Sequence, residues 1–199
     1  VSTDACLTLT AIHPTRNYSV PSRHIPIMDI SILHTALSRL LAANAQGWGA
    51  YFAVGLRRSG LGRWQRGDAS AVVTLPALFA DVDRHAADTL AQLRHFPLKP
   101  SCIVDSGGGY HAYWWLDMPT CDFPCARSLL RMLAAHLGGD SLSIAQSLRL
   151  PGTINTKPNR GGRCHVVECS DVRYSLDDFN TLIGDFSIGG RQKPFTTVQ

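Results

Sequence analysis

Two carboxylates separated by a single residue, Asp81 and Asp83, follow directly on an apolar run that begins at Leu78. Side chains along a strand alternate between its faces, so we expect both acids on one face and Val82 toward the core. Two such charges repel each other unless a cation lies between them, and oxygen ligands of this kind favour Mg²⁺ or Mn²⁺ with phosphate oxygens completing the shell. A strand end that exposes two acids to water is the alternative, and this motif alone does not decide.

A glycine-rich turn joins two expected strands at 101–105 and 110–116. It consists of Ser106, Gly107, Gly108 and Gly109, with His111 two residues further on. Glycine lets a ligand approach the backbone closely and leaves N–H groups free to meet anions. A histidine at this place can bond a phosphate oxygen or act as a general acid. A tight hairpin with an ordinary histidine is the alternative.

A third group surrounds Pro151-Gly152, which fits a type II turn with glycine at the position of positive φ. The turn should gather two cations and two hydrogen-bonding side chains: Arg149, Thr153, Asn155 and Lys157. Such a set suits a triphosphate or a nucleic-acid backbone. An arginine held in a salt bridge at a turn explains the same residues equally well.

Residues 57–67 form a basic loop with four arginines, three glycines and one tryptophan. The arginines are Arg57, Arg58, Arg63 and Arg66. Guanidinium groups bind phosphate through two hydrogen bonds and stack on bases. Beside an acidic site, this loop predicts contact with nucleotide phosphates or a template strand. A basic hairpin without a function is the alternative.

The bulk composition fits one domain of 199 residues, with 45% hydrophobic and 17% charged residues. We expect the domain over 1–186 and a linker or tail over 187–199. The net charge of +4 is compatible with nucleic acid. Neither a signal peptide nor a membrane span of about 18 apolar residues is visible, which predicts a cytoplasmic protein without a membrane partner.

The six cysteines should be reduced in such a compartment. A structural zinc site around Cys121, Cys125, Cys164, His165 and Cys169 fits no tight template but stays open.

Strands and helices are expected in irregular alternation, which indicates an α+β or α/β fold with antiparallel hairpins. The other expected strands are 6–12, 50–56, 78–82 and 163–169, the last with Val166 inward. The expected helices follow Asp29 and Asp122 or occupy 84–95, 140–150 and 176–183. Residues 13–27, with three prolines, predict an irregular connection.

Taken in order, the three motifs closely resemble the archaeo-eukaryotic primase (AEP) superfamily, and in particular the primase-polymerase domains of plasmids, phages and other mobile elements. The resemblance spans about Leu7 to Phe186. It implies an α+β fold: an RRM-like catalytic core of antiparallel or mixed sheets flanked by helices, packed with a small N-terminal α/β unit. It also implies a nucleotidyltransferase, a DNA primase or DNA polymerase that uses two metal ions on a single-stranded or primed DNA template.

The resemblance assigns roles to the motif residues. Asp81 and Asp83 would hold the Mg²⁺ or Mn²⁺ ions, and His111 would contact the phosphates of the incoming dNTP or NTP, beside Ser106 and the glycines. Arg149, Asn155 and Lys157 would lie near nucleotide or template. One position departs from the pattern, because relatives carry a third acid where this chain has Ser143. Asp140 is the nearest replacement, whereas Asp105 precedes the glycine turn and is less suited.

Two functions besides the enzyme stay open, and the missing third acid supports the first of them. A nucleotide- or DNA-binding module of a replication initiator would tolerate a weakened metal site. A metal-dependent nuclease would use the two acids and the histidine but leaves the segment from Arg149 to Asn155 unexplained. We expect the catalytic fragment to continue into further domains, such as a helicase. The sequence does not distinguish dNTP from NTP, or priming from extension.

Overall fold

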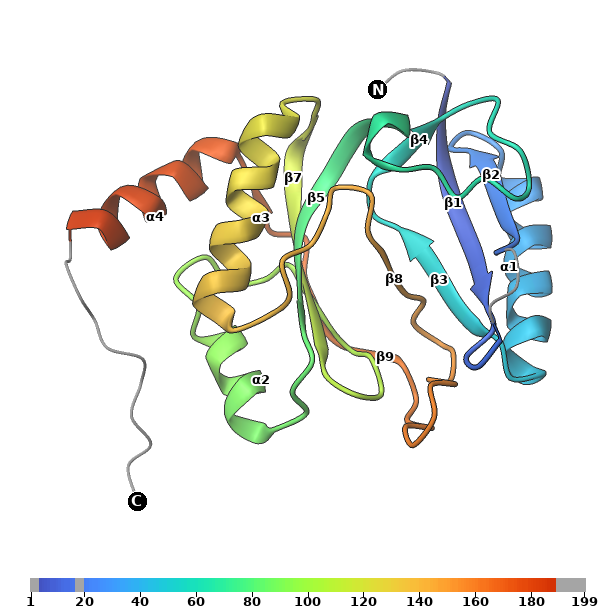
Figure 1. The fold of residues 1–199 in the computed structure, drawn as a ribbon. Coiled ribbons are helices and arrows are strands. Elements are labelled where there is room, and N and C mark those ends of the chain that lie inside the picture. Colours follow the sequence, from blue (N-terminus) through green and yellow to red (C-terminus); the bar gives the residue numbers. More distant parts are fainter. Residues whose placement is uncertain (1–3, 17–19, 189–199) are drawn as a thin grey trace.

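The computed structural model describes residues 4–16 and 20–188 of the chain (Figure 1). Its elements, in chain order, are β1 (Ala5–Ile12), β2 (Ser22–Pro26), α1 (Ile30–Ala45), β3 (Gly49–Ala53), β4 (Leu56–Arg58), the 3₁₀ turn Ala69–Ala71, β5 (Val72–Val82), α2 (Ala87–Arg94), β6 (Cys102–Asp105), β7 (Tyr110–Thr120), α3 (Phe123–Leu137), β8 (Ser147–Arg149), β9 (His165–Cys169), β10 (Arg173–Tyr174) and α4 (Leu176–Ile188).

One curved sheet runs through the described part of the chain in the order β8-β3-β1-β4-β5-β7-β6-β9, with antiparallel pairing throughout. Strand β2 pairs with β1, and β10 pairs in parallel with β7. Figure 1 shows two halves: α1 covers the half with β1 to β3, and α2, α3 and α4 lie beside the half with β5 and β7. The expected α+β class with a small N-terminal unit is confirmed.

Two hydrophobic clusters correspond to these halves. The larger one is built around β5, where Leu78, Phe79 and Val82 are completely or almost completely buried against α3 and β7. A strand covered on both faces has no solvent side, which explains why its sequence is a continuous apolar run. The smaller cluster joins α1 to the sheet and consists of Leu9, Ile25, Ala36, Leu40 and Ala50.

The helix ends follow the expected local signals. Asp29 and Asp122 accept hydrogen bonds from the backbone N–H of Ile32 and Cys125, which caps α1 and α3. Gly138 ends α3 with a left-handed φ of 62°. Ser175 and Asp178 form a reciprocal capping box at the start of α4. No described helix has the length and apolar character needed to cross a membrane.

Three local expectations are wrong. Residues 22–26 form a strand instead of an irregular connection, and 140–150 contains no helix but ends in β8. Strand β2 forms because it pairs with β1, and strand β8 forms because it pairs with β3. The local hydrophobic periodicity of the sequence does not reveal these pairings between distant residues. Val166 is 48% exposed, because β9 is an edge strand and not an interior one. Of the expected tail, 187–188 continue α4, and the remainder lies outside the described residues.

Candidate active site

Strand pairing places Asp81 directly opposite His111, at the ends of β5 and β7. The two side chains approach to 3.7 Å between Oδ1 of Asp81 and Nε2 of His111. Asp83 lies beyond the strand and lines the same cavity of about 100 Å³. Val82 between the acids is fully buried, as alternation predicts. The first two motifs therefore meet because one antiparallel pair carries both.

The glycine turn is packed against the protein itself. The backbone N–H of Gly107 donates to Oδ1 of Asp105 at 2.7 Å, and Ser106 Oγ donates to the carbonyl of Gly109 at 3.0 Å. Gly107 has a φ of 75°, and a Cβ there would lie 2.5 Å from the carbonyl oxygen of Gly162. Only Ser106 of this turn lines the cavity described above. The glycines thus serve close chain packing, a role that the motif did not reveal.

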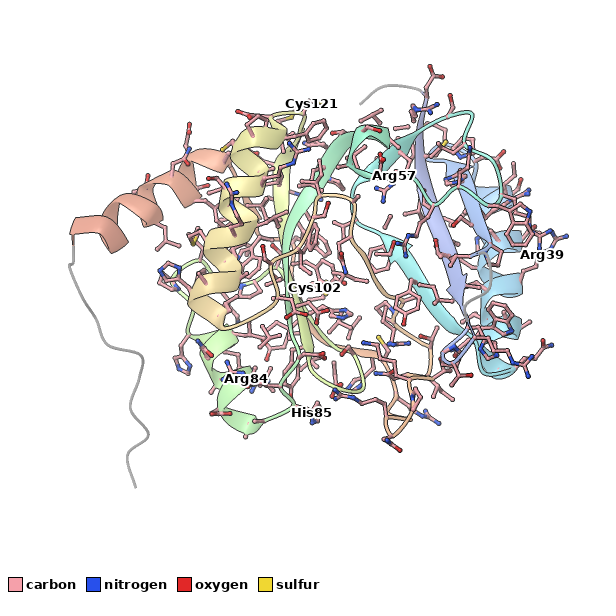
Figure 2. All side chains as sticks on the ribbon, viewed as in Figure 1. Arg39, Arg57, Arg84, His85, Cys102 and Cys121 are labelled. Carbon is pink, nitrogen blue, oxygen red and sulfur yellow. The ribbon has the colours of Figure 1, made fainter. Side chains whose placement is uncertain are left out.

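His85 strengthens this turn from outside. Its Nε2 lies 2.7 Å from Oδ2 of Asp105, and its ring stacks on Tyr110 at a centroid distance of 5.2 Å. Figure 2 labels His85 near the end of the β6–β7 hairpin. Asp105 therefore binds His85 and Gly107, which leaves it unsuited as a metal ligand, as its sequence position indicated.

The Asn155 side chain links the segment after Arg149 to the glycine turn through hydrogen bonds. Its Nδ2 donates to the carbonyl of Ser106 at 3.1 Å, and its Oδ1 accepts from the backbone N–H of Lys157 at 3.1 Å. The residue is buried, whereas Lys157 is exposed at the cavity rim. Asn155 thereby positions Lys157 beside the glycine turn. Gly152 takes the expected positive φ, 86°, in the preceding turn.

Arg149 is buried in the wall opposite the acids. It lies opposite Tyr51 in the β3–β8 pair, donates from Nη2 to the Tyr51 hydroxyl at 2.9 Å and stacks on that ring at 4.8 Å. Its Nη1 is buried without a hydrogen-bond partner, and so is Oγ of Ser147 two residues earlier. Buried polar atoms are normally satisfied, so a bound ligand or an ordered water is needed to supply partners for these two atoms, whose residues both line the cavity.

The sequence interpretation missed several cavity residues: Tyr51, Gln146, Ser147 and Arg160. Arg160 donates from Nη1 to the carbonyl of Gly108 at 2.7 Å and so brings another cation to the glycine turn. Its sequence signal was present, since it follows Lys157 in the glycine-rich run that ends at Gly162. Tyr51 gave no signal, because strand pairing alone brings it to Arg149.

Burial and charge alter the two facing groups in opposite directions. Burial, with repulsion from Asp83 and Asp140, raises the pKa of Asp81 to about 6. Burial, with repulsion from Arg149 and Lys157, lowers the pKa of His111 to about 3. The pair is therefore not a salt bridge at neutral pH, despite its distance. Burial keeps the pKa of Tyr113 well above its usual value, so its hydroxyl stays protonated, 3.4 Å from Nδ1 of His111. Where this hydroxyl donates to Nδ1, the imidazole carries its proton on Nε2, facing Asp81.

The basic loop corrects one expectation. Arg57 is completely buried and donates to the carbonyls of Gly55 at 2.7 Å and Ala145 at 2.8 Å, so it cannot contact nucleic acid (Figure 2). Burial lowers its pKa to about 10. Arg58, Arg63 and Arg66 are exposed, but none of them lines the cavity of Asp81. The loop thus contains one buried arginine that stabilises the fold and three exposed arginines that a ligand could contact.

Asp140, the expected replacement for the third acid, contacts Asp81 through its backbone, and its carboxylate acts on Asp81 through its charge. Gly139 packs against the carbonyl of Asp81, and the N–H of Asp140 donates to that carbonyl at 3.0 Å. The side chain of Asp140 is exposed and does not line the cavity, and Ser143 is also exposed. Among residues 4–16 and 20–188 there is no group of three or more His, Cys, Asp or Glu side chains that could hold a metal ion. This finding gives the open zinc site no support.

The site has an acidic wall and a basic wall. Asp81 and Asp83 offer hard oxygen ligands, whose mutual repulsion a divalent cation would relieve, as the raised pKa of Asp81 indicates. Arg149, Lys157 and Arg160 also line the cavity, and Nη1 of Arg149 is buried without a hydrogen-bond partner. The residues present therefore fit Mg²⁺ or Mn²⁺ if a phosphorylated ligand completes the coordination.

The fold agrees with that of known primases. No family model and no curated protein matches the chain. Among solved structures, the AEP domain of the cyanophage S-2L primase-polymerase superposes with a TM-score of 0.65 at 20% identity, over 89% of this chain and 88% of that one. Primase RepB′ superposes with a TM-score of 0.64 at 14% identity, over 94% of this chain and 61% of that one. The catalytic domain of RepB′ in complex with initiator DNA gives 0.63 at 13% identity, over 95% and 93%.

These similarities show that the chain has the fold of solved primase catalytic domains. More narrowly, the fold is that of the AEP domain of a phage primase-polymerase and is also similar to that of primase RepB′, which confirms the fold that the motifs implied.

Proposed function

We propose that this chain catalyses template-dependent nucleotidyl transfer, as a DNA primase or DNA polymerase that makes or extends primers for a mobile element. One observation carries the proposal: a single cavity unites two carboxylates with a buried arginine and serine whose polar atoms lack partners. A nucleoside triphosphate with Mg²⁺ or Mn²⁺ has the oxygens and charge to satisfy both walls.

Asp81 and Asp83 would hold the metal ions. When bound, the ions supply Lewis-acid activation of the attacking 3′-hydroxyl and stabilise negative charge that develops on the α-phosphate. Burial, and after it repulsion from Asp83 and Asp140, raises the pKa of Asp81, and a bound cation would oppose both effects, so both carboxylates would be ionised in the loaded site.

The opposite wall would bind the phosphates. Arg149 lines the cavity, and its hydrogen bond to Tyr51 fixes the guanidinium, whose Nη1 has no partner within the protein. Ser147 adds a hydroxyl, and Lys157 and Arg160 add charge at the rim. His111 is neutral in the free protein and can donate from Nε2 to a phosphate oxygen. As a general acid it would first have to gain a proton, which the nearby phosphate charge would favour.

The template would lie along two exposed arginines of the basic loop, Arg58 and Arg66, whereas Arg63 lines a separate groove. The structure of the RepB′ catalytic domain with initiator DNA supports a DNA-binding role for this fold. Phosphate contacts of this kind weaken with salt, so the affinity for DNA should fall as the salt concentration rises.

Primer extension tests the proposal. The protein is incubated with a primed DNA template, dNTPs or NTPs, and Mn²⁺ or Mg²⁺, beside an Asp81→Asn/Asp83→Asn variant. Extension by the wild-type protein and a loss of about a thousandfold or more in the variant is the expected outcome. Equal extension by both proteins would remove the acids from the reaction. Shortening of the DNA without nucleotides would instead identify a nuclease.

A nucleotide- or DNA-binding module is the second candidate. The observation that favours it is the exposed Asp140, outside the cavity, together with Ser143 at the position of the usual third acid. In that case no extension occurs, while nucleotide binding survives and depends on Arg149. A Ser143→Asp variant that gains or strengthens extension would show that the missing carboxylate limits catalysis.

A further inference from the structure

A second cavity lies on the N-terminal unit, between the β1–β2 pair and α1, and shares no residue with the candidate active site. Its volume is about 260 Å³. The floor is aliphatic and is formed by Leu9, Ala11, Ile32, Ala36, Leu40 and Ala43. Side chains alternate on β1, so Leu9 and Ala11 face α1 and project away from Thr8 and Thr10.

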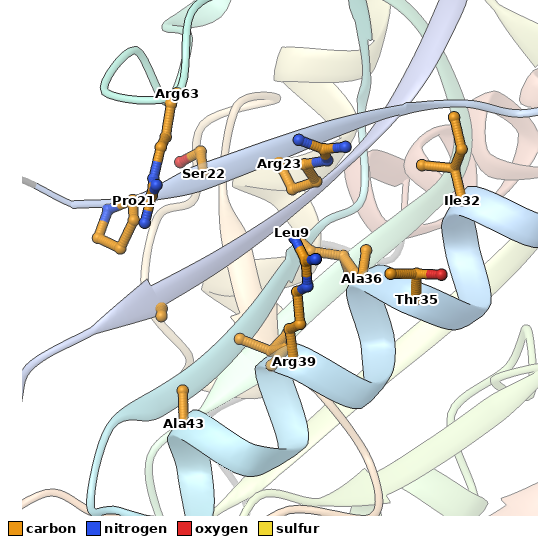
Figure 3. A pocket seen from close by; sticks show the side chains of 12 residues that line it. Leu9, Pro21, Ser22, Arg23, Ile32, Thr35, Ala36, Arg39, Ala43 and Arg63 are labelled. Atoms are coloured by element: carbon orange, nitrogen blue, oxygen red, sulfur yellow. The ribbon is translucent and has the colours of Figure 1, made fainter.

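Three arginines surround this floor, each from a different element. Arg23 projects from β2, Arg39 from α1 and Arg63 from the loop after β4 (Figure 3). No carboxylate in the described part of the chain forms an ion pair with any of them. Arg63 lies over the exposed ring of Trp64 at 5.0 Å. Three unpaired guanidinium groups around one groove create a local positive field that favours an anionic partner.

The apolar surface continues past the groove at the start of α1. Ile27, Met28 and Ile30 are 37%, 81% and 66% exposed, and Ile32 at the groove follows them in the chain. Exposed apolar residues that are grouped in this way commonly mark a protein interaction surface. Figure 2 shows Arg39 at the outer surface of this half of the molecule.

We propose that this groove binds an acidic peptide segment of another protein, one that carries aliphatic or aromatic anchor residues between or beside its carboxylates. The anchors fill the aliphatic floor, and the carboxylates pair with Arg23, Arg39 and Arg63. Nucleic acid fits less well, because the floor has no aromatic face on which a base could stack. The edge of β2 is also covered at Ser22, whose N–H donates to the carbonyl of Arg63 at 2.7 Å, so strand addition is blocked there.

Fluorescence anisotropy with one defined probe tests the proposal. The probe is a fluorescein-labelled peptide of four aspartates followed by leucine and phenylalanine. We expect saturable binding with a Kd of about 10 µM, weakened at least tenfold by an Arg23→Glu/Arg39→Glu variant. Arg131→Glu on α3 is the control for general charge, since this arginine is also exposed and lies on the other half of the molecule. It should leave binding within about twofold.

Two further measurements separate the groove from its surroundings. Thr35→Phe fills the groove from an exposed position of α1 without a change of charge and should abolish peptide binding. Replacing the probe's leucine and phenylalanine by serine, or its aspartates by asparagine, should weaken binding at least tenfold. An oligothymidylate that displaces the probe, and whose own binding needs Arg39, would assign the groove to nucleic acid and overturn the proposal.

Absence of probe binding, or equal weakening by Arg131→Glu, would likewise overturn it. Primer extension by the groove variants on a primed template reports on the active site independently, so the two proposals can fail separately. We expect extension to be unchanged, because the groove and the candidate active site share no lining residue.

Discussion

Asp81 and His111 face each other across β5 and β7 with 3.7 Å between carboxylate oxygen and imidazole nitrogen, yet they do not form an ion pair. Burial raises the pKa of Asp81 and lowers the pKa of His111, so that each group disfavours its charged form. The cations nearest to His111, Arg149 and Lys157, add to this effect. The protein alone therefore leaves the acids under repulsion, and a bound cation with phosphates would relieve it.

The stability of the metal-free protein should reflect this repulsion. The pKa of Asp81 in the folded state, about 6, lies above its ordinary value of 3.8, so its stabilising contribution is present at low pH and lost as the pH rises through 6. In the presence of a chelator at about pH 7.5, Asp81→Asn should raise the free energy of unfolding by about 1–2 kcal/mol. Urea denaturation measures this value, and the difference should shrink at about pH 4. A variant that is less stable than wild type at both pH values would contradict it.

Metal binding should depend on the same acid. Saturating Mn²⁺ stabilises only a protein that binds it in the folded state, so the melting temperature of the wild-type protein should rise by several degrees, about 2–4 °C. The Asp81→Asn/Asp83→Asn variant should show no rise. Ca²⁺ serves as a control for general screening by divalent ions. Equal shifts for both proteins would place the ion elsewhere.

Arg149 should be required for nucleotide binding because it lines the cavity and its Nη1 is a buried donor without a partner. Arg149→Lys keeps a positive charge but loses the planar contact with Tyr51 and the second donor. We expect the affinity for a nucleoside triphosphate to fall at least tenfold, about 1.4 kcal/mol or more, by isothermal titration calorimetry. Arg127→Lys on the exposed face of α3 is the control, and unchanged affinity in Arg149→Lys would contradict the assignment.

Asn155 should act by positioning, because its side chain links Ser106 to Lys157. Asn155→Ala should cost about 1–3 kcal/mol of stability through the buried groups that lose partners. It should also raise KM more than it lowers kcat in primer extension, since Lys157 is displaced while the acids remain. Asn180→Ala removes an exposed asparagine on α4 and controls for loss of an amide. An effect confined to kcat would argue for direct participation.

Gly107 offers a comparison between steric contact and backbone strain. Gly107→Ala would place Cβ 2.5 Å from the carbonyl oxygen of Gly162 at a φ of 75°. Gly152→Ala has a similar φ of 86° but no atom within 4 Å. We expect a loss of about 1–2 kcal/mol for Gly152→Ala and about 3 kcal/mol or more for Gly107→Ala, measured by denaturant unfolding. Equal losses would mean that the contact with Gly162 yields at no cost.

Substitutions of buried and exposed arginines in the basic loop should have different effects, one on stability and the other on DNA binding. Arg57→Gln should lower stability by about 2–4 kcal/mol, because a buried guanidinium donates to the carbonyls of Gly55 and Ala145. Exposed Arg58→Gln/Arg66→Gln should leave stability nearly unchanged and weaken single-stranded DNA binding severalfold, as anisotropy would show. If Arg57→Gln weakened DNA binding while stability was retained, the buried position would not explain its role.

The local features of the fold could be predicted because they depend on residues that are adjacent in the sequence. Asp29 and Asp122 cap the N-termini of α1 and α3, and Gly138 ends α3. The apolar run before Asp81 is a buried strand. The short strands β2 and β8 could not be predicted in the same way, because their hydrogen bonds come from partners distant in the chain. Arg57 illustrates the same limit, since an arginine in a basic loop has the same sequence signal whether it is buried or exposed.

The sequence by itself determined the three motifs, their order and the α+β class, because alternation, turn glycines and helix caps act over a few residues. Tertiary structure decided how the motifs meet. The pairing of β5 with β7 sets Asp81 against His111, and the pairing of β3 with β8 gives Arg149 its partner Tyr51. It also decided that Asp140 donates a backbone hydrogen bond to Asp81 while its carboxylate lies outside the cavity, and that the Asn155 side chain donates to the carbonyl of Ser106. Sheet register and burial depend on contacts between distant residues, and these fix the directions in which the side chains of a site point.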